Sequence, residues 1–166
     1  MRKAINLHIN REVYSAYLYA SMGSYFDDAS LDGFSNWMRV QVQEELSHAA
    51  RFWDFMGQRG GRVLLTAIDG PPTDWASPLA VMEEVYAHEQ EVSAGINGLV
   101  DLATEERDHM AREFLQWFVA EQVEEEATAD KIVQDLKRIG DNGHGLLMID
   151  RELGGRTYTP PADSTV

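Results

Sequence analysis

The sequence contains no cysteine, only five prolines, few positive charges and no long hydrophobic run. Without cysteine, disulfides and thiolate metal sites are excluded. Lys and Arg number 14 against 28 Asp and Glu, which gives a formal net charge of −14. Such a polyanion repels nucleic acid and anionic lipid and attracts cations. No apolar run approaches the roughly 18 residues of a membrane span, and Arg2 and Lys3 lead into a charged amphipathic segment unlike a signal peptide. We therefore expect a cytoplasmic protein that binds neither nucleic acid nor membranes.

The sequence does contain enough apolar material for a core. Hydrophobic residues make up 44% of the 166 residues, and six Phe, six Tyr and four Trp are among them. This composition argues against disorder despite the charge, and the length suits a single domain. We expect one domain over residues 1–155 and a C-terminal tail over residues 156–166, in which residues 157–161 are frayed or loosely docked.

Four long segments repeat apolar residues with a period of about 3.6, which is typical of amphipathic helices. Ser30-Leu31-Asp32 indicates the start of the second helix, Ser77-Pro78 the start of the third and Gly140 the end of the fourth. Only residues 62–65 resemble a strand, and that stretch is too short to form a sheet alone. The pattern predicts helices over residues 2–27, 31–58, 78–104 and 107–139, and a short fifth helix near 142–153.

The lengths of the connections restrict the topology. The links after the first and third long helices are so short that each pair must form an antiparallel hairpin. The middle link, residues 59–77, can run the full length of a long helix when extended. We therefore predict an all-α fold, a four-helix bundle in which a long crossover joins helices two and three and a short fifth helix follows.

Polar side chains interrupt the apolar face of every long helix near its middle. Burying an uncompensated charge costs several kcal/mol, on the order of the whole stability of a small domain, and few Lys or Arg lie on these faces to offset it. Bound metal would supply the positive charge. Carboxylate oxygens with one imidazole and no sulfur suit iron or manganese, with zinc as a competitor. The residues concerned are Glu12, Glu45, His48, Glu89, Gln122 and Glu125.

The spacing of these residues predicts an asymmetric di-metal site. Glu45 and His48, three residues apart, share a helix face and can meet one ion. Di-iron helix bundles use two single Glu residues and two Glu-x-x-His motifs, whereas the last helix here has Gln122-x-x-Glu125. One metal position is therefore better ligated than the other. A further set of carboxylates is rotated by about 100° from the first and could form a third metal position: Glu44, Glu121 and Glu124.

Five stretches together resemble prokaryotic non-haem ferritin over nearly the whole chain. They are EVYSAYLY at 12–19, QEELSH at 43–48, HEQ at 88–90, FLQWFVAEQVEEE at 114–126 and GLLMIDREL at 145–153. The resemblance implies a cage of twenty-four subunits that oxidises Fe(II) with O2 or H2O2 at a di-iron centre inside each subunit and stores the ferric product as a mineral.

The resemblance also implies a role for each site residue. Glu12, Glu45 and His48 would hold the first iron. Glu45 would bridge to a second iron held by Glu89 and Glu125. Gln122 would lie beside the pair, and Tyr19 would hydrogen-bond to the site or belong to the core. The third iron would be held by Glu44, Glu121 and Glu124.

Alternatives within and outside this family remain. Bacterioferritin would need His at position 125 and its haem-ligating Met at position 46, where this chain has Glu125 and Leu46, so no haem is expected. The twelve-subunit DNA-protecting cages lack a fifth helix. A di-iron peroxidase resembling rubrerythrin would normally carry a Cys-x-x-Cys domain, and a non-catalytic helical assembly protein would leave Glu45 and His48 unexplained. The remaining histidines are expected to be surface or packing residues: His8, His88, His109 and His144.

Overall fold

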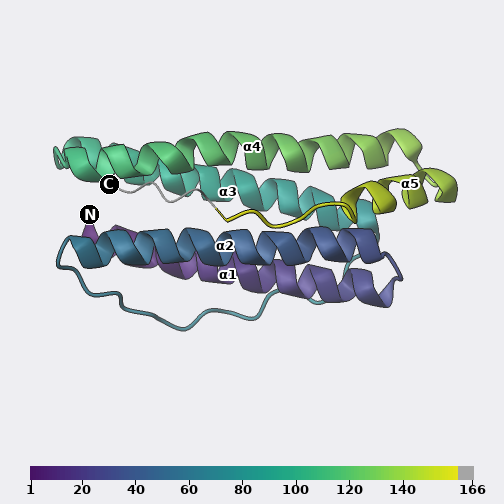
Figure 1. Cartoon of the computed structure of the whole chain (residues 1–166), viewed down its shortest axis with the longest axis horizontal. Helices are drawn as coiled ribbons and strands as arrows, with labels where there is room; N and C mark the ends of the chain where they lie inside the picture. Colours follow the sequence, from purple (N-terminus) through teal and green to yellow (C-terminus); the bar gives the residue numbers. More distant parts are fainter. Residues whose placement is uncertain (161–166) are drawn as a thin grey trace. The chain divides into compact units, whose positions relative to one another are not determined.

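In the computed structural model, which describes residues 1–160, every regular element is a helix (Figure 1). This confirms the all-α prediction, and the boundaries agree with the predicted ones to within two residues. Residues 62–65 form no strand. The helices are α1 (Arg2–Asp28), α2 (Asp32–Gln58), α3 (Pro78–Glu105), α4 (His109–Ile139) and α5 (Gly143–Leu153).

Side chains next to the helix ends explain where α3 and α4 begin. Ser77 accepts a hydrogen bond from the backbone N–H of Ala80 at 3.1 Å, and Asp108 accepts one from Ala111 at 3.1 Å. Each oxygen thereby satisfies an N–H that has no partner within its helix. At the other end of α4, Gly140 has a positive φ of 55°, a conformation that costs glycine little.

The start of α2 lies within one residue of the predicted position, but its cap comes from elsewhere in the chain. Leu31 occupies the N-cap position and makes no side-chain cap. Instead, Oδ1 of Asp150 on α5 accepts hydrogen bonds from the backbone N–H groups of Gly33 and Phe34, at 2.8 and 3.1 Å. A carboxylate at this place also interacts favourably with the positive end of the helix dipole. The cap of α2 therefore comes from a residue more than 110 positions away in the chain.

The chain divides into two compact units. The first contains residues 1–5 and 75–142. In it α3 packs against α4 through a face of buried apolar side chains, among them Val85, Ile96, Leu115 and Phe118. Lys137 pairs with Glu83 at 2.8 Å.

The second unit contains residues 6–74 and the described part of the chain from Gly143 onward. In it α1 and α2 lie side by side and α5 packs against α2 (Figure 1). Buried aromatic rings join the two long helices near one end, where Phe26 of α1 stacks on Phe34 of α2 with centroids 4.9 Å apart.

The crossover between α2 and α3 follows α1 closely, as its length predicted (Figure 1). The backbone N–H of Leu64 donates to Oδ1 of Asn6 at 2.6 Å, near the start of α1. The hydroxyl of Ser21, farther along the helix, donates to the carbonyl of Pro72 at 2.6 Å. Side chains of α1 thus satisfy backbone groups that a loop without secondary structure would otherwise leave to water.

The beginning of the C-terminal tail is docked on α2 and not frayed. The guanidinium of Arg156 lies over the ring of Trp37, 4.9 Å from its centroid, and hydrogen-bonds to Gln41. It also pairs with Glu44 at 2.7 Å. Asn36 donates to the carbonyl of Arg156 at 2.9 Å. Arg156, which directly precedes the segment expected to be frayed or loosely docked, is therefore held in place, and residues 161–166 lie outside the described part of the chain.

Replacing Arg156 with Ala should loosen the tail, because the ion pair, the amide contact and the cation–π contact disappear together. We expect the free energy of unfolding to fall by about 1–2 kcal/mol and proteases to cleave the tail faster. Thermal unfolding and limited proteolysis measure the two effects. Arg151→Ala, which removes an exposed guanidinium from α5, is the control and should leave both unchanged.

Candidate metal centre

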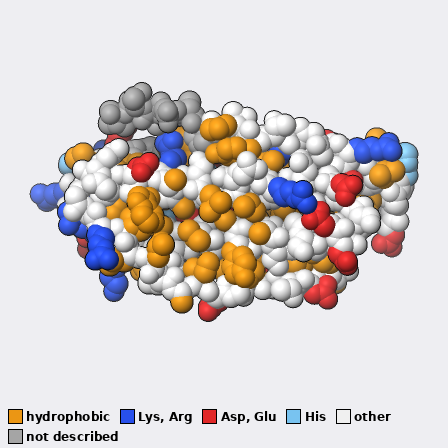
Figure 2. Space-filling view, turned by 60° about the horizontal axis from the view of Figure 1, so that its bottom comes forward, with side chains coloured by type: hydrophobic (Ala, Val, Ile, Leu, Met, Phe, Trp, Pro, Cys, Tyr) orange, Lys and Arg blue, Asp and Glu red, His pale blue; other side chains and the backbone are white. Residues whose placement is uncertain are grey.

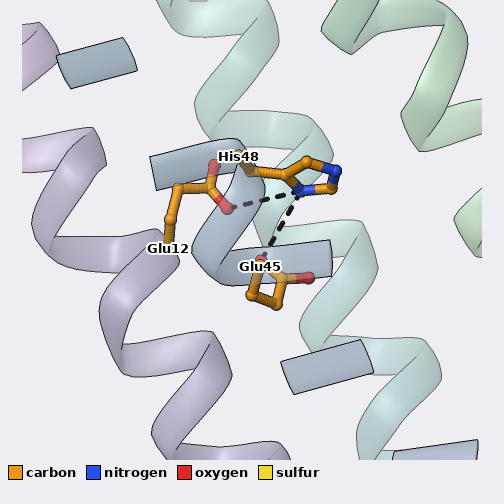
Figure 3. A group of neighbouring side chains, drawn as sticks. All are labelled: Glu12, Glu45 and His48. Atoms are coloured by element: carbon orange, nitrogen blue, oxygen red, sulfur yellow. Dashed lines mark ion pairs between the residues drawn. The ribbon is translucent and has the colours of Figure 1, made fainter. Parts of the chain in front are cut away.

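Three buried ligand-type side chains meet between α1 and α2. Glu12 comes from α1, and Glu45 and His48 come from α2 (Figure 3). Their exposed fractions are 1%, 1% and 3%. Nδ1 of His48 lies 3.9 Å from Oε2 of Glu12 and 3.8 Å from Oε2 of Glu45. One ligand atom from each residue lies within 4.8 Å of the others, so the group could hold a metal ion.

The helical repeat explains why these polar groups are inward. Glu45 and His48 continue the buried face of α2 that contains Trp37, Met38 and Phe52. A spacing of three places them on one side of the helix, one above the other. The sequence therefore sets the direction of these side chains through the apolar residues before and after them.

Interactions within this group shift the pKa values of two of its members. Burial alone would raise the pKa of Glu12, but interactions with His8, Glu45 and His48 outweigh burial and lower that pKa to about 2. Burial lowers the pKa of His48; Glu12 opposes this effect, and Arg51 adds to it. Both shifts favour the forms that bind metal, an ionised carboxylate and a neutral imidazole.

His8 lies next to this group, and the sequence did not single it out. It is 4% exposed, and its Nε2 lies 2.7 Å from Oε1 of Glu12. The available signal was its position four residues before Glu12 on the same face of α1. A single histidine on a helix face is so often a packing residue that this spacing alone did not distinguish it.

A second group of predicted residues meets between α3 and α4. Nε2 of Gln122 donates to Oε2 of Glu89 at 3.0 Å and lies 3.4 Å from the hydroxyl of Ser93. That hydroxyl hydrogen-bonds to Glu126. Glu125, three residues after Gln122, is also buried. Gln122 therefore orients the Glu89 carboxylate, while Ser93 and Glu126 extend the polar network toward the surface.

The remaining predicted residues differ in exposure. Tyr19 is fully buried on α1, seven residues after Glu12 and on the same face. Glu124 is exposed, and Glu121 is partly buried. Glu44 is partly buried and pairs with Arg156. For these four residues the predicted roles remain predictions.

Known proteins resemble this chain over almost its full length. A family model described as the ferritin-like domain matches residues 2–139. A bacterial non-heme ferritin from Bacteroides fragilis is 46% identical over 156 residues, which are 94% of this chain and 97% of that protein. The chain belongs to the ferritin family. The resemblance seen in the five sequence stretches is thereby confirmed.

Other members of the ferritin family are similar in sequence and in structure. A bacterial non-heme ferritin from Staphylococcus saprophyticus is 38% identical over 155 residues, 93% of each chain. The solved open pore ferritin of the archaeon Archaeoglobus fulgidus is 55% identical, with a TM-score of 0.94 over 95% of this chain and 96% of that one. A closed form of the same ferritin, engineered by site-directed mutagenesis, matches with the same TM-score. These likenesses confirm the predicted ferritin-like fold. No described helix is long and apolar enough to cross a membrane.

The donor set of this ferritin family member suits a hard divalent cation. Two carboxylates and one imidazole are ligands that iron accepts. Oε2 of Glu12 is buried and has no hydrogen-bond partner among the described residues. A buried polar atom without a partner is costly, and a bound cation would satisfy it. The residues around Glu12 thus fit a metal ion in both chemistry and placement.

The two pKa shifts predict how acid affects the metal-free protein. His48 has a folded pKa below its ordinary 6.5, so the unfolded state binds more protons and stability is lost as the pH falls below that value. Glu12, lowered from 4.5 to about 2, adds stability above pH 4.5 that is lost as the pH falls toward 2. We expect the Tm measured with a chelator present to fall between pH 7 and pH 5, and again below 4.5.

Variants at two histidines separate the first of these losses from general acid effects. His48→Gln removes the titrating group, so the Tm of this variant should change less between pH 7 and pH 5 than that of the wild type. His109→Gln replaces an exposed histidine, and its Tm should change as much as that of the wild type. If the Tm falls with pH equally in the wild type and in His48→Gln, the loss of stability comes from other groups.

Proposed function

We propose that this chain is a ferroxidase and iron store, which oxidises Fe(II) to Fe(III) with O2 or H2O2 and retains the product as a ferric mineral inside a homo-oligomeric cage. The observation that carries the proposal is the buried group of Glu12, Glu45 and His48, two hard carboxylates and an imidazole within reach of one ion. Membership of the ferritin family supports the same function.

The proposal assigns roles to the buried polar residues of both units. Glu12, Glu45 and His48 hold the first Fe(II). Glu45 is shared with a second Fe(II) held by Glu89 and Glu125. The chemistry of carboxylate ligands supports this assignment, because hard oxygen donors favour the more highly charged ion. Two further residues have supporting roles: Gln122, which hydrogen-bonds to Glu89, and the buried Tyr19.

The electron balance explains why two iron positions are useful. Each Fe(II) gives up one electron. Two electrons and two protons convert O2 to H2O2, and two more of each convert H2O2 to water. A centre that holds two Fe(II) can therefore supply a pair of electrons together and avoid releasing a one-electron product. The carboxylates stay ionised throughout and offset the charge that iron gains.

A third iron position is also part of the proposal, with Glu44, Glu121 and Glu124 as ligands. Glu44 is paired with Arg156 at 2.7 Å, so an incoming cation would have to share or replace that guanidinium. This position should consequently bind iron more weakly than the buried group, whose Glu12 Oε2 has no such competitor.

The proposal includes assembly into a cage of twenty-four subunits and a location in the cytoplasm, and an exposed apolar surface supports the assembly. Hydrophobic side chains gather on the face that Figure 2 brings forward. Leu46, Trp53 and Leu65 are about half exposed or more, and they border a shallow groove in the second unit. A second copy of the chain would remove this apolar surface from water. The net charge of −14 would attract Fe(II) to the assembly.

One experiment tests the proposal. Fe(II) is added in air to the purified protein while near-ultraviolet absorbance reports oxidation and size-exclusion chromatography with iron analysis reports the mass and the iron retained. A large particle that keeps many more irons than its carboxylates could ligate supports the proposal. Catalytic peroxide turnover with only two irons per chain would instead indicate a rubrerythrin-like oxidoreductase. Oxidation no faster than in buffer would exclude both activities.

A further inference from the structure

The histidine next to Glu12 is held in one orientation by two contacts. His8 lies on α1, and its ring packs edge-on against Phe52 of α2, with centroids 4.8 Å apart and an interplanar angle of 62°. Its Nε2 lies 2.7 Å from Oε1 of Glu12. Both residues are almost completely buried. The ring therefore has an apolar side against Phe52 and a polar edge against the carboxylate.

The two oxygens of Glu12 are consequently in different surroundings. Oε1 faces His8 at 2.7 Å. Oε2 faces His48, 3.9 Å from its Nδ1, and has no hydrogen-bond partner among the described residues. One oxygen is thus close to a potential donor, and the other points toward the group that could hold a metal ion.

We propose that His8 is a positioning residue, which holds Oε1 of Glu12 through Nε2 and leaves Oε2 as the oxygen that ligates Fe(II). This inference rests on the proposed function, in which Glu12 is an iron ligand. A carboxylate that ligates metal is normally held by a further partner, and loss of that partner typically weakens metal binding by roughly 10–100-fold. His8 is the residue in place to act as that partner.

The geometry distinguishes this role from direct ligation. Among the described residues, the ligand-type group whose atoms lie within 4.8 Å of one another comprises Glu12, Glu45 and His48, and His8 is outside it. Nε2 of His8 is buried, and its approach to Glu12 does not have full hydrogen-bond alignment. Such contacts commonly tighten when the ligand binds, and a small turn of the Glu12 carboxylate toward an ion at Oε2 would allow this one to do so.

His8→Gln and His8→Asn test the role of the ring nitrogen Nε2. The side-chain nitrogen of Gln can take the place of Nε2, whereas that of Asn is too short to reach it and takes the place of Nδ1. His8→Leu, which fills similar space without a polar atom, is a second variant lacking the contact. His109→Leu changes an exposed histidine on α4 and is the matched control.

The measurement is anaerobic titration of the metal-free cage with Co(II), followed by calorimetry and by the visible absorption of the bound ion. We expect His8→Asn and His8→Leu to bind the first Co(II) roughly 10–100-fold more weakly than the wild type, with an altered spectrum. His8→Gln and His109→Leu should bind it nearly as the wild type does. Size and Tm without metal show that each variant folds.

The outcomes separate this inference from the proposed function. If the wild type oxidises Fe(II) rapidly while His8→Asn and His8→Gln bind Co(II) with the same affinity, His8 does not position Glu12. If the wild type does not oxidise Fe(II) but its Co(II) affinity still depends on His8 in the expected order, the positioning role stands and the ferroxidase proposal fails.

Discussion

Replacing Glu45 with Ala is expected to abolish the rapid oxidation of Fe(II), with the initial rate falling by at least about 100-fold. This is more than the usual effect of losing a residue that only hydrogen-bonds to a metal ligand. Glu45 is 1% exposed and lies 3.8 Å from His48. In the proposed centre it is the carboxylate shared by both irons, so its loss removes a ligand from each. Stopped-flow absorbance after mixing with Fe(II) in air measures the rate.

The same change should have little effect on assembly, because Glu45 lies inside the subunit and not on its surface. Without metal, Glu45 hydrogen-bonds to Glu12 and helps to keep that carboxylate ionised, so Glu45→Ala loses this contact and leaves a small cavity. The Tm of the metal-free variant should therefore be somewhat lower than that of the wild type, while the mass of the particle stays the same. Asp101→Ala, which removes an exposed carboxylate from α3, should keep the full rate. If the Glu45→Ala protein oxidised Fe(II) at the wild-type rate, the centre would lie elsewhere.

The polar residues of the proposed centre could be identified from sequence because they violate a strong pattern. A helix face that is otherwise apolar must be buried, so Glu12, Glu45, His48 and Glu89 could be placed inward without coordinates. The structure brings the first three together and pairs Glu89 with Gln122. His8 lies on the same side of α1 as Glu12, but the periodicity that places a residue inward does not say which polar atom it contacts.

Contacts between distant parts of the chain were the features that the sequence did not predict. Asp150 caps α2 from α5, and Arg156 docks on Trp37. Local sequence signals describe caps made by residues next to a helix end, so Ser30-Leu31-Asp32 could indicate where α2 begins but not that Asp150 caps it. The positions of Asp150 and Arg156 depend on how α5 packs, which a pattern within one helix does not encode.

A substitution at the contact between α5 and α2 should also have a large effect, in this case on the stability of the fold. Gly33 lies in the first turn of α2, where its backbone meets α5. A Cβ atom at this position would lie 1.6 Å from the backbone oxygen of Asp150 and 2.9 Å from its Oδ1. No side-chain rotation relieves a clash with backbone, so Gly33→Ala must push α5 away from α2 and weaken the two hydrogen bonds that Asp150 accepts.

Gly33→Ala should therefore lower the free energy of unfolding by about 2–3 kcal/mol, even though Ala is the better helix former. Gly57→Ala is the matched control on the same helix, because a Cβ there meets nothing within 4 Å. It should raise the stability by about 0.5–1 kcal/mol through helix propensity alone. Chemical denaturation of both variants gives the two values with opposite signs. If Gly33→Ala were as stable as Gly57→Ala, α5 would not pack against α2 as described, and the cap that Asp150 provides would be absent as well.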